Sequence, residues 1–254
     1  MRRLLALVGL LALAGCGDDG SLAGGGADER KPKLVVSAAS SLKEALLSCA
    51  KEFPDATLRF QFAGSDELAA QIRQGVPIDV LAAANTKLPE ALAKEGKLEE
   101  PVVFATNQLV LAVPSDGAKV DSLRALERPG VTLVVGAEGV PVGDYTRAVL
   151  ERLGSARSKA VLANVRSNEP DVKGIVGKLA QGAADAGFVY ASDVKAASGK
   201  LRAIELPAEL EPTATYGAGV VAAAKRPDAA EAFVDDLLAG GCHEALLAAG
   251  FGEP

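Results

Sequence analysis

Aromatic side chains are scarce in this chain of 254 residues. Phe, Trp and Tyr together make up 4% of it, and Trp is absent. A binding site for sugars or bases that depends on large aromatic stacking surfaces is therefore not expected. Basic residues are also fewer than acidic ones, and the net charge at pH 7 is −6. This balance argues against nucleic acid as a partner.

Histidine and cysteine are rarer still, with one His and three Cys in the whole chain. No His/Cys cluster has the spacing of a metal site. The chain also lacks the Gly-x-Ser-x-Gly elbow of serine hydrolases and the Gly-x-x-x-x-Gly-Lys-Ser/Thr loop that cradles nucleotide phosphates. We therefore expect no catalytic residues, no cofactor and no directly coordinated metal cation, and the chain is not expected to be an enzyme.

The N-terminus has the pattern of an export signal. Residues 1–15 place Arg2 and Arg3 before a short apolar run, as secretory signals do. The end of this run, Leu13-Ala14-Gly15-Cys16, resembles a bacterial lipobox, which implies cleavage before Cys16 and a lipid on that cysteine. The alternative is an ordinary soluble secretory signal. Residues 16–33 are rich in Gly and charge and indicate a flexible tether.

Two cysteines remain after the signal, Cys49 and Cys242. An exported protein resides in an oxidising compartment, where the two can form one intramolecular disulfide. The alternative is a pair of buried thiols, because Cys49 falls on the apolar stripe of a predicted helix. The sequence leaves both open.

The most informative stretch runs from residue 34 to residue 53. An apolar run, Leu34 to Val36, passes through small residues and then into apolar positions at helical spacing, from Leu42 to Phe53. Ser41 followed by Glu44 has the pattern of a capping box. A strand, a short loop and a helix start leave backbone N–H groups unpaired at the positive end of the helix dipole. Such a junction suits an anion.

Similar junctions recur along the chain, two in each half. Each has a strand, a loop of Gly, Ala, Ser and Pro and then a helix start, at residues 37–42, 63–66, 136–144 and 167–172. Strands are predicted at residues 57–62, 78–83, 107–114, 131–135, 186–190 and 216–223, and helices at residues 66–74, 87–95, 144–153 and from 172 on. Their alternation predicts an α/β fold with parallel strands. Ligands in open α/β sheets bind beyond the carboxyl ends of the strands. If the two halves face each other, the junctions meet at one cleft.

Five motifs, in this order, resemble the molybdate-binding proteins of bacterial ABC importers across residues 33–252. They are Ala38-Ala39-Ser40-Ser41-Leu42, Phe62-Ala63-Gly64-Ser65, Gly75-Val76-Pro77-Ile78-Asp79, Val140-Pro141-Val142-Gly143-Asp144-Tyr145 and Gly187-Phe188-Val189-Tyr190-Ala191-Ser192-Asp193. The resemblance implies a type II periplasmic-binding fold, in which two α/β lobes joined by two crossing strands enclose a ligand cleft. Lobe one would comprise residues 34–106 plus 218–254, and lobe two residues 107–217.

The resemblance also implies a ligand and the residues that hold it. The ligand would be molybdate or tungstate, held by neutral hydrogen-bond donors. Ser41 and Ser65 would donate from lobe one, Val142 and Val172 would donate backbone N–H groups from lobe two, and Tyr190 would donate its phenol O–H.

Two residues depart from the family pattern. Ser40 stands where small apolar residues are common, so it can replace or join Ser41. Asp66 lies beside Ser65, and a carboxylate about 6 Å from a dianion would cost on the order of 5 kcal/mol at an effective dielectric constant of about 20. We therefore predict that Asp66 points out of the cleft.

The resemblance implies an extracytoplasmic or periplasmic lipoprotein that is anchored to a membrane, monomeric, and delivers its ligand to an ABC permease in the cytoplasmic membrane. The alternatives are a binding protein for another oxyanion, such as sulfate or phosphate, and a structural lipoprotein that binds nothing.

Overall fold

A computed structural model describes residues 31–254 of the chain. The predicted signal peptide, Cys16 and most of the predicted tether therefore lie outside the described residues. The first strand begins at Lys33, the last residue of the predicted tether. Within the described part, no helix has both the length and the apolar character needed to cross a bilayer.

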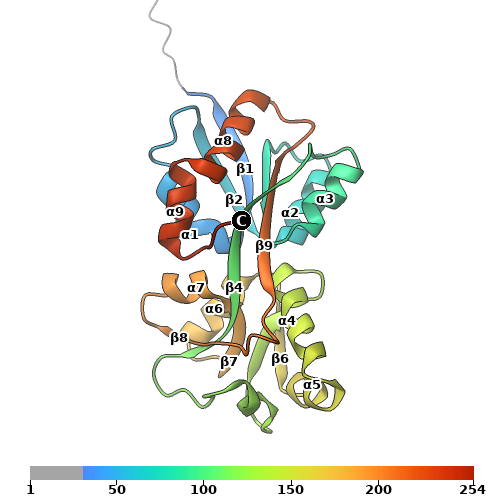
Figure 1. Cartoon of the computed structure of the whole chain (residues 1–254), viewed down its shortest axis with the longest axis vertical. Helices are drawn as coiled ribbons and strands as arrows, with labels where there is room; N and C mark the ends of the chain where they lie inside the picture. The colour runs from blue at the N-terminus through green and yellow to red at the C-terminus, as the bar shows by residue number, and fades with distance from the viewer. Residues whose placement is uncertain (1–30) are drawn as a thin grey trace, which may run out of the picture. The chain divides into compact units, whose positions relative to one another are not determined.

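The strands follow one continuous order, β2-β1-β3-β9-β4-β7-β5-β6, with β8 paired to β4. Two long strands, β4 (Val102–Pro114) and β9 (Thr213–Val220), run through the middle of the described region (Figure 1). Helices gather at either end of these two strands. The architecture is therefore two α/β lobes connected by two crossing strands.

Lobe one contains three parallel strands, in which β1 pairs with β2 on one side and with β3 on the other. Its elements are β1 (Lys33–Ala39), η1 (Ser40–Leu42), α1 (Lys43–Cys49), β2 (Thr57–Ala63), α2 (Ser65–Arg73), β3 (Val80–Ala83), α3 (Lys87–Lys94), α8 (Pro227–Ala239) and α9 (Gly241–Ala249). Residues Leu34, Val36 and Ala38 of β1 are fully buried, and so is Ser37 between them. Burial on both faces is typical of a parallel strand that helices cover on either side.

Lobe two repeats the same design with β5 at its centre, parallel to both β6 and β7. Its elements are η2 (Leu123–Glu127), β5 (Leu133–Gly136), α4 (Pro141–Arg152), α5 (Ser155–Leu162), β6 (Val165–Glu169), α6 (Val172–Ala180), β7 (Ala186–Tyr190), α7 (Ala191–Ala196) and β8 (Leu201–Ile204). In both lobes the strands end near the other lobe, and the helices that border the other lobe begin there (Figure 1).

Strand β4 belongs to both lobes. Residues Val102 to Gln108 pair with β9, whereas Leu109 to Pro114 pair with β7 and β8. The sequence predicted this strand only at residues 107–114, and β4 begins five residues earlier, at Val102. The boundaries predicted for the lobes, at residues 106/107 and 217/218, fall within these crossing strands and stay predictions.

Two predicted helix starts differ from the structure. The capping box at Ser41 is wrong, because Ser41 lies inside the short helix η1, and helix α1 begins at Lys43 without a side-chain cap. The second-lobe helix predicted from Asp144 begins three residues earlier, at Pro141. Proline at the first helical position is favourable, because its missing N–H has no helical partner to lose.

A disulfide joins Cys49 at the end of α1 to Cys242 in α9. The two cysteines are 193 residues apart in sequence, and both side chains are buried. The bond therefore ties the C-terminal helix to the first helix of lobe one. Helices α8 and α9 also contribute Phe233 and Leu246 to the lobe-one core.

Candidate functional site

A small pocket lies where the two lobes meet. Its walls come from strand ends and helix starts of both lobes: Ala39, Ser40, Ser41, Ala63, Gly64, Ser65, Ala84, Val140, Pro141, Val142, Asp171, Val172 and Tyr190. All five residues that the resemblance implied as ligand contacts are in this set. The four junctions predicted from the sequence thus converge on one pocket.

On the lobe-one side, Ser41 is held by a residue that the sequence did not single out as a site residue. The Ser41 Oγ and Tyr216 Oη atoms are 3.0 Å apart and hydrogen bonded, and both side chains are buried. Burial raises the pKa of Tyr216 well above its ordinary value, so its phenol stays protonated. When Tyr216 donates to Ser41, the serine hydroxyl proton is free to point into the pocket.

Ser65 is arranged in a similar way at the start of α2. The backbone N–H of Ala84, just after β3, donates to Ser65 Oγ at 3.0 Å. Because this bond uses an acceptor position of the hydroxyl, the Ser65 proton remains available to a ligand. Only 1% of Ser65 is exposed, so water competes little for this donor.

The lobe-two side offers backbone donors. Val142 lies in the first turn of α4 and Val172 is the first residue of α6. Backbone N–H groups in the first turn of a helix have no partner within the helix, and the helix dipole places partial positive charge there. Helix α4 can pack this closely against the loop at Ala137 because residue 143 is Gly; a Cβ there would lie 2.0 Å from the Ala137 carbonyl oxygen.

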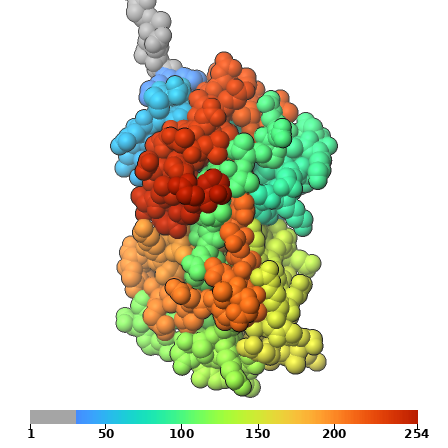
Figure 2. Space-filling view, in the orientation of Figure 1, coloured from blue at the N-terminus to red at the C-terminus, as the bar shows by residue number. Residues whose placement is uncertain are grey.

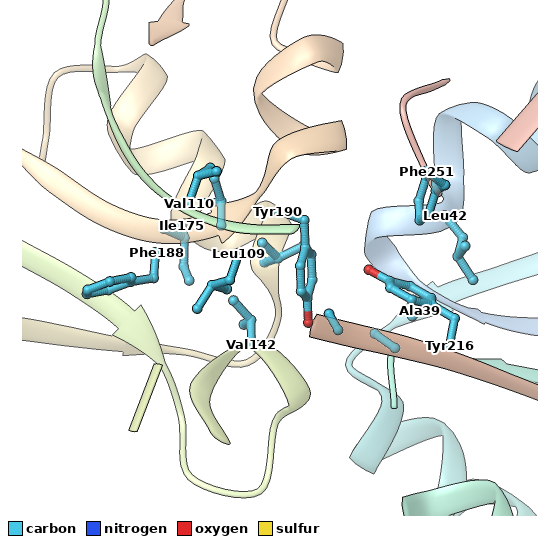
Figure 3. Close-up of a cluster of buried hydrophobic side chains, with 14 of the residues drawn as sticks. Ala39, Leu42, Leu109, Val110, Val142, Ile175, Phe188, Tyr190, Tyr216 and Phe251 are labelled. Atoms are coloured by element: carbon cyan, nitrogen blue, oxygen red, sulfur yellow. The ribbon is translucent and has the colours of Figure 1, made fainter. Parts of the chain in front are cut away.

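Tyr190 ends β7 and lies between the two lobes (Figure 3). It is 1% exposed, and its Oη atom has no hydrogen-bond partner among the described residues. Burial raises its pKa well above the ordinary value, so the phenol is a donor at neutral pH. The ring packs edge-on against Tyr216, with centroids 5.8 Å apart. This contact sets the direction of a hydroxyl that lines the pocket.

The charges around the pocket are unusual for an anion site. No Arg or Lys side chain is among the lining residues given above, and the one charged residue among them is Asp171. The Asp171 carboxylate caps α6 by accepting the Gly174 N–H at 3.0 Å. Asp66 is not in the lining, and its Oδ1 atom is buried with no hydrogen-bond partner in the part of the chain that the structure describes. Its direction relative to a bound ligand stays a prediction.

The lobes approach each other closely beside the pocket. A Cβ on Gly64 of lobe one would lie 2.4 Å from the carbonyl oxygen of Pro170 in lobe two. The backbone of Gly64 has φ −63°, which any residue can adopt, so the glycine is required by space and not by conformation. Within the described residues, no group of His, Cys, Asp and Glu side chains is arranged to hold a metal ion.

A family model described as bacterial extracellular solute-binding protein matches residues 34–252. This chain belongs to that family. The molybdate-binding protein ModA of Mycobacterium tuberculosis is 32% identical to this solute-binding protein, over 99% of this chain and 97% of the relative. ModA of Haemophilus influenzae is 28% identical over 86% of this chain and 89% of its own length.

A solved structure shows the same fold. The periplasmic molybdate-binding protein of Azotobacter vinelandii superposes with a TM-score of 0.78 at 23% identity, covering 87% of this chain and 99% of that one. The predicted type II periplasmic-binding fold is thereby confirmed for this solute-binding protein, and so is its resemblance to the molybdate-binding proteins.

Proposed function

We propose that this chain is the substrate-binding component of a molybdate ABC importer. The observation that carries the proposal is the pocket between the lobes, where neutral donors converge and no cationic side chain takes part. Hydroxyls come from Ser41, Ser65 and Tyr190, and backbone N–H groups come from Val142 and Val172. Hydrogen bonds to an ion are about twice as strong as those between neutral groups. A full set of such donors therefore suits a dehydrated tetrahedral dianion.

A neutral donor set selects its ligand by size and by protonation. Tungstate has nearly the same size and charge as molybdate, so the pocket should bind both. Sulfate is smaller, so some donors would fall short of it, and each buried donor left without a partner costs roughly 1–3 kcal/mol. Losing one or two contacts predicts binding that is about 5-fold to more than 1000-fold weaker.

Ser40 extends this donor set. It lies beside Ser41 in the pocket wall and is 6% exposed. We expect Ser40→Ala to weaken molybdate binding by about fivefold, the loss of one modest hydrogen bond. Ser37→Ala is the matched control, because Ser37 is fully buried in β1 and is not among the lining residues. Equal affinity of the two variants would remove Ser40 from the donor set.

The lobes close around the ligand by bending of the crossing strands, at about residues 107–114 and 213–223. Asn107 at this position is 5% exposed, and its Nδ2 donates to Ser192 Oγ at 2.8 Å. The ligand reaches donors on both lobes only in the closed form, and this difference in affinity drives closure. The closed form then docks on a permease in the cytoplasmic membrane.

Calorimetric titration with molybdate, tungstate, sulfate and phosphate tests the proposal. We expect tight binding of molybdate and tungstate with similar affinity, and weaker binding of the other two. Tight binding of sulfate without molybdate would instead indicate a carrier for another oxyanion. If none of the four anions binds, the chain is a structural lipoprotein and the proposal is wrong.

We also propose a lipid anchor at Cys16, which would hold the protein on a membrane surface outside the cytoplasm. We propose in addition that the protein is a monomer. The support is the lipobox-like sequence Leu13-Ala14-Gly15-Cys16 and the extracellular family. Detergent phase partitioning of the wild type and Cys16→Ser tests it. We expect the wild type in the detergent phase, and equal partitioning of both proteins into water would contradict the anchor.

A further inference from the structure

Lys173 bridges the two lobes at one side of the pocket. It follows Val172 at the start of α6, and its Nζ atom lies 2.7 Å from Glu44 Oε2 of α1. Helix α6 belongs to lobe two and α1 to lobe one, so this ion pair crosses the cleft. Helix α6 also lies close to η1, which carries Ser41. The ion pair thus lies next to the proposed donors of both lobes.

The same ammonium faces a second carboxylate inside lobe two. Asp193 Oδ1 lies 3.1 Å from Lys173 Nζ, and the Asp193 side chain is fully buried. Among the described residues Asp193 Oδ1 has no hydrogen-bond partner, so its contact with Lys173 is an ion pair. Although burial opposes it, the attraction of Asp193 and Glu44 raises the pKa of Lys173. Lys173 therefore stays charged between two carboxylates.

Asp193 connects this charge to the pocket. Its other oxygen, Oδ2, accepts the backbone N–H of Tyr190 at 3.3 Å. Tyr190 is the residue whose phenol lines the pocket and has no hydrogen-bond partner in residues 31–254. A chain of contacts thus runs from Glu44 in lobe one, through Lys173 and Asp193, to the backbone of Tyr190.

The lobes also meet at a second lysine. Lys195 of α7 donates to the carbonyl oxygen of Ala248 near the end of α9, at 2.8 Å. Figure 2 shows dark red atoms of the C-terminal helix directly above orange atoms of lobe two on this face. Lys195 is exposed, whereas only 25% of the Lys173 side chain is exposed. The Lys195 contact therefore stabilises the meeting of the lobes less than the Lys173 contact does.

We propose that Lys173 is a positioning residue for anion capture, which pairs with Glu44 on closure and holds Tyr190 in place through Asp193. This inference rests on the proposed function and deepens it. Opening the cleft separates Lys173 from Glu44 but leaves its contact with Asp193 within lobe two. The ion pair between Lys173 and Glu44 therefore stabilises only the closed form. Its effect is to slow ligand release without touching the ligand.

Binding kinetics of single and double variants test this role. We expect Lys173→Met to weaken molybdate binding about tenfold and Glu44→Gln about threefold, because the first change also leaves Asp193 without its counter-charge. The double variant should bind no more weakly than Lys173→Met, since both changes remove one interaction. The loss should appear in the dissociation rate, with the association rate unchanged within about twofold.

The chain supplies a matched control on the same helix. Lys178 of α6 pairs with Glu169 at 2.6 Å, and both residues belong to lobe two. Lys178→Met removes an ion pair from α6 without touching the contact between lobes, so it should leave molybdate affinity unchanged. Lys173→Arg should restore most of the affinity, because it keeps the charge and the reach.

The outcomes separate this inference from the proposed function. If the wild type fails to bind molybdate, the proposed function is wrong. If the wild type binds and Lys173→Met matches Lys178→Met, only the positioning role is wrong. Should Lys173→Met fail to fold, Glu44→Lys decides, because 48% of the Glu44 side chain is exposed. This variant puts two ammonium groups together, and unchanged dissociation would overturn the inference.

Discussion

Replacing Tyr190 by Phe tests the donor set most directly. The substitution removes one oxygen atom and keeps the ring that packs against Tyr216 at 5.8 Å. In the structure this oxygen is buried and has no hydrogen-bond partner among the described residues. Its removal therefore breaks no hydrogen bond of the protein, and any effect on binding reports contact with the ligand.

The expected magnitude follows from the charge of the ligand. A hydrogen bond to a charged group contributes about 1.5–3 kcal/mol, and 1.4 kcal/mol is a factor of ten in affinity, so Tyr190→Phe should weaken molybdate binding by about 10- to 150-fold. The free energy of unfolding of the ligand-free protein should not fall. Burying a hydroxyl without a partner is unfavourable, and the variant no longer does so.

Tyr216→Phe is the matched control. The Tyr216 hydroxyl is bonded to Ser41 Oγ at 3.0 Å, so its removal should lower the free energy of unfolding by about 1 kcal/mol. Isothermal titration with molybdate and chemical denaturation without ligand give the two quantities for each variant. The reasoning is refuted if Tyr190→Phe destabilises the ligand-free protein as much as Tyr216→Phe and binds molybdate as tightly as the wild type.

Three further predictions concern closure, the disulfide and pH. Gly64→Ala should weaken molybdate binding with little change in melting temperature, because a Cβ there would lie 2.4 Å from an atom of lobe two. Gly177→Ala is the control, because a Cβ there meets nothing within 4 Å, and it should leave binding unchanged. Equal affinities of the two variants would contradict the prediction. Joint replacement of Cys49 and Cys242 by Ser should lower the free energy of unfolding by up to about 5 kcal/mol in the chain-entropy model, and a denaturation midpoint equal to that of the wild type would refute it. Burial raises the pKa of Asp193 from 3.8 to about 6, so between these values the folded state holds a proton that the unfolded state has lost. Stability from this group therefore falls by about 2 kcal/mol as pH rises from 4 to 7. Urea denaturation across this range should show that fall relative to Asp193→Asn, and parallel curves would contradict it.

Several carboxylates act in the opposite direction with pH, which is why the comparison with Asp193→Asn is needed. Although burial opposes it, hydrogen bonds from Lys178 and Ser167 lower the pKa of Glu169. The backbone of Thr132 and the side chain of Lys119 do the same for Asp185, again against burial. Stability from these two groups is lost as pH falls, so it partly masks the contribution of Asp193.

Much of the local structure follows from the sequence alone. Apolar runs separated by loops of Gly, Ala, Ser and Pro predicted strands β1, β2 and β7 and helices α2, α3 and α6 to within a few residues. The elements missed were α5, β6 and β8, whose residues are partly exposed and show no clean period. A pattern that repeats every two or four residues is visible in sequence because it depends on neighbours along the chain.

Through the family resemblance, the sequence indicated five residues that all line the pocket, and their contact with a ligand stays a prediction. It could not identify their supports. Tyr216 bonds to Ser41 across 175 residues, and Lys173 reaches Glu44 across 129. The sequence left the pairing of Cys49 and Cys242 open as well.

What the sequence by itself determined is therefore the kind of junction and its chemistry, small neutral donors at helix starts. Only the tertiary structure decided which donors are already engaged, which hydroxyls face the pocket and which charges meet across the cleft. The physical reason is distance along the chain. Side chains more than a hundred residues apart, such as Ser41 and Tyr216 or Cys49 and Cys242, meet only once the whole chain has folded, and no local pattern encodes that meeting.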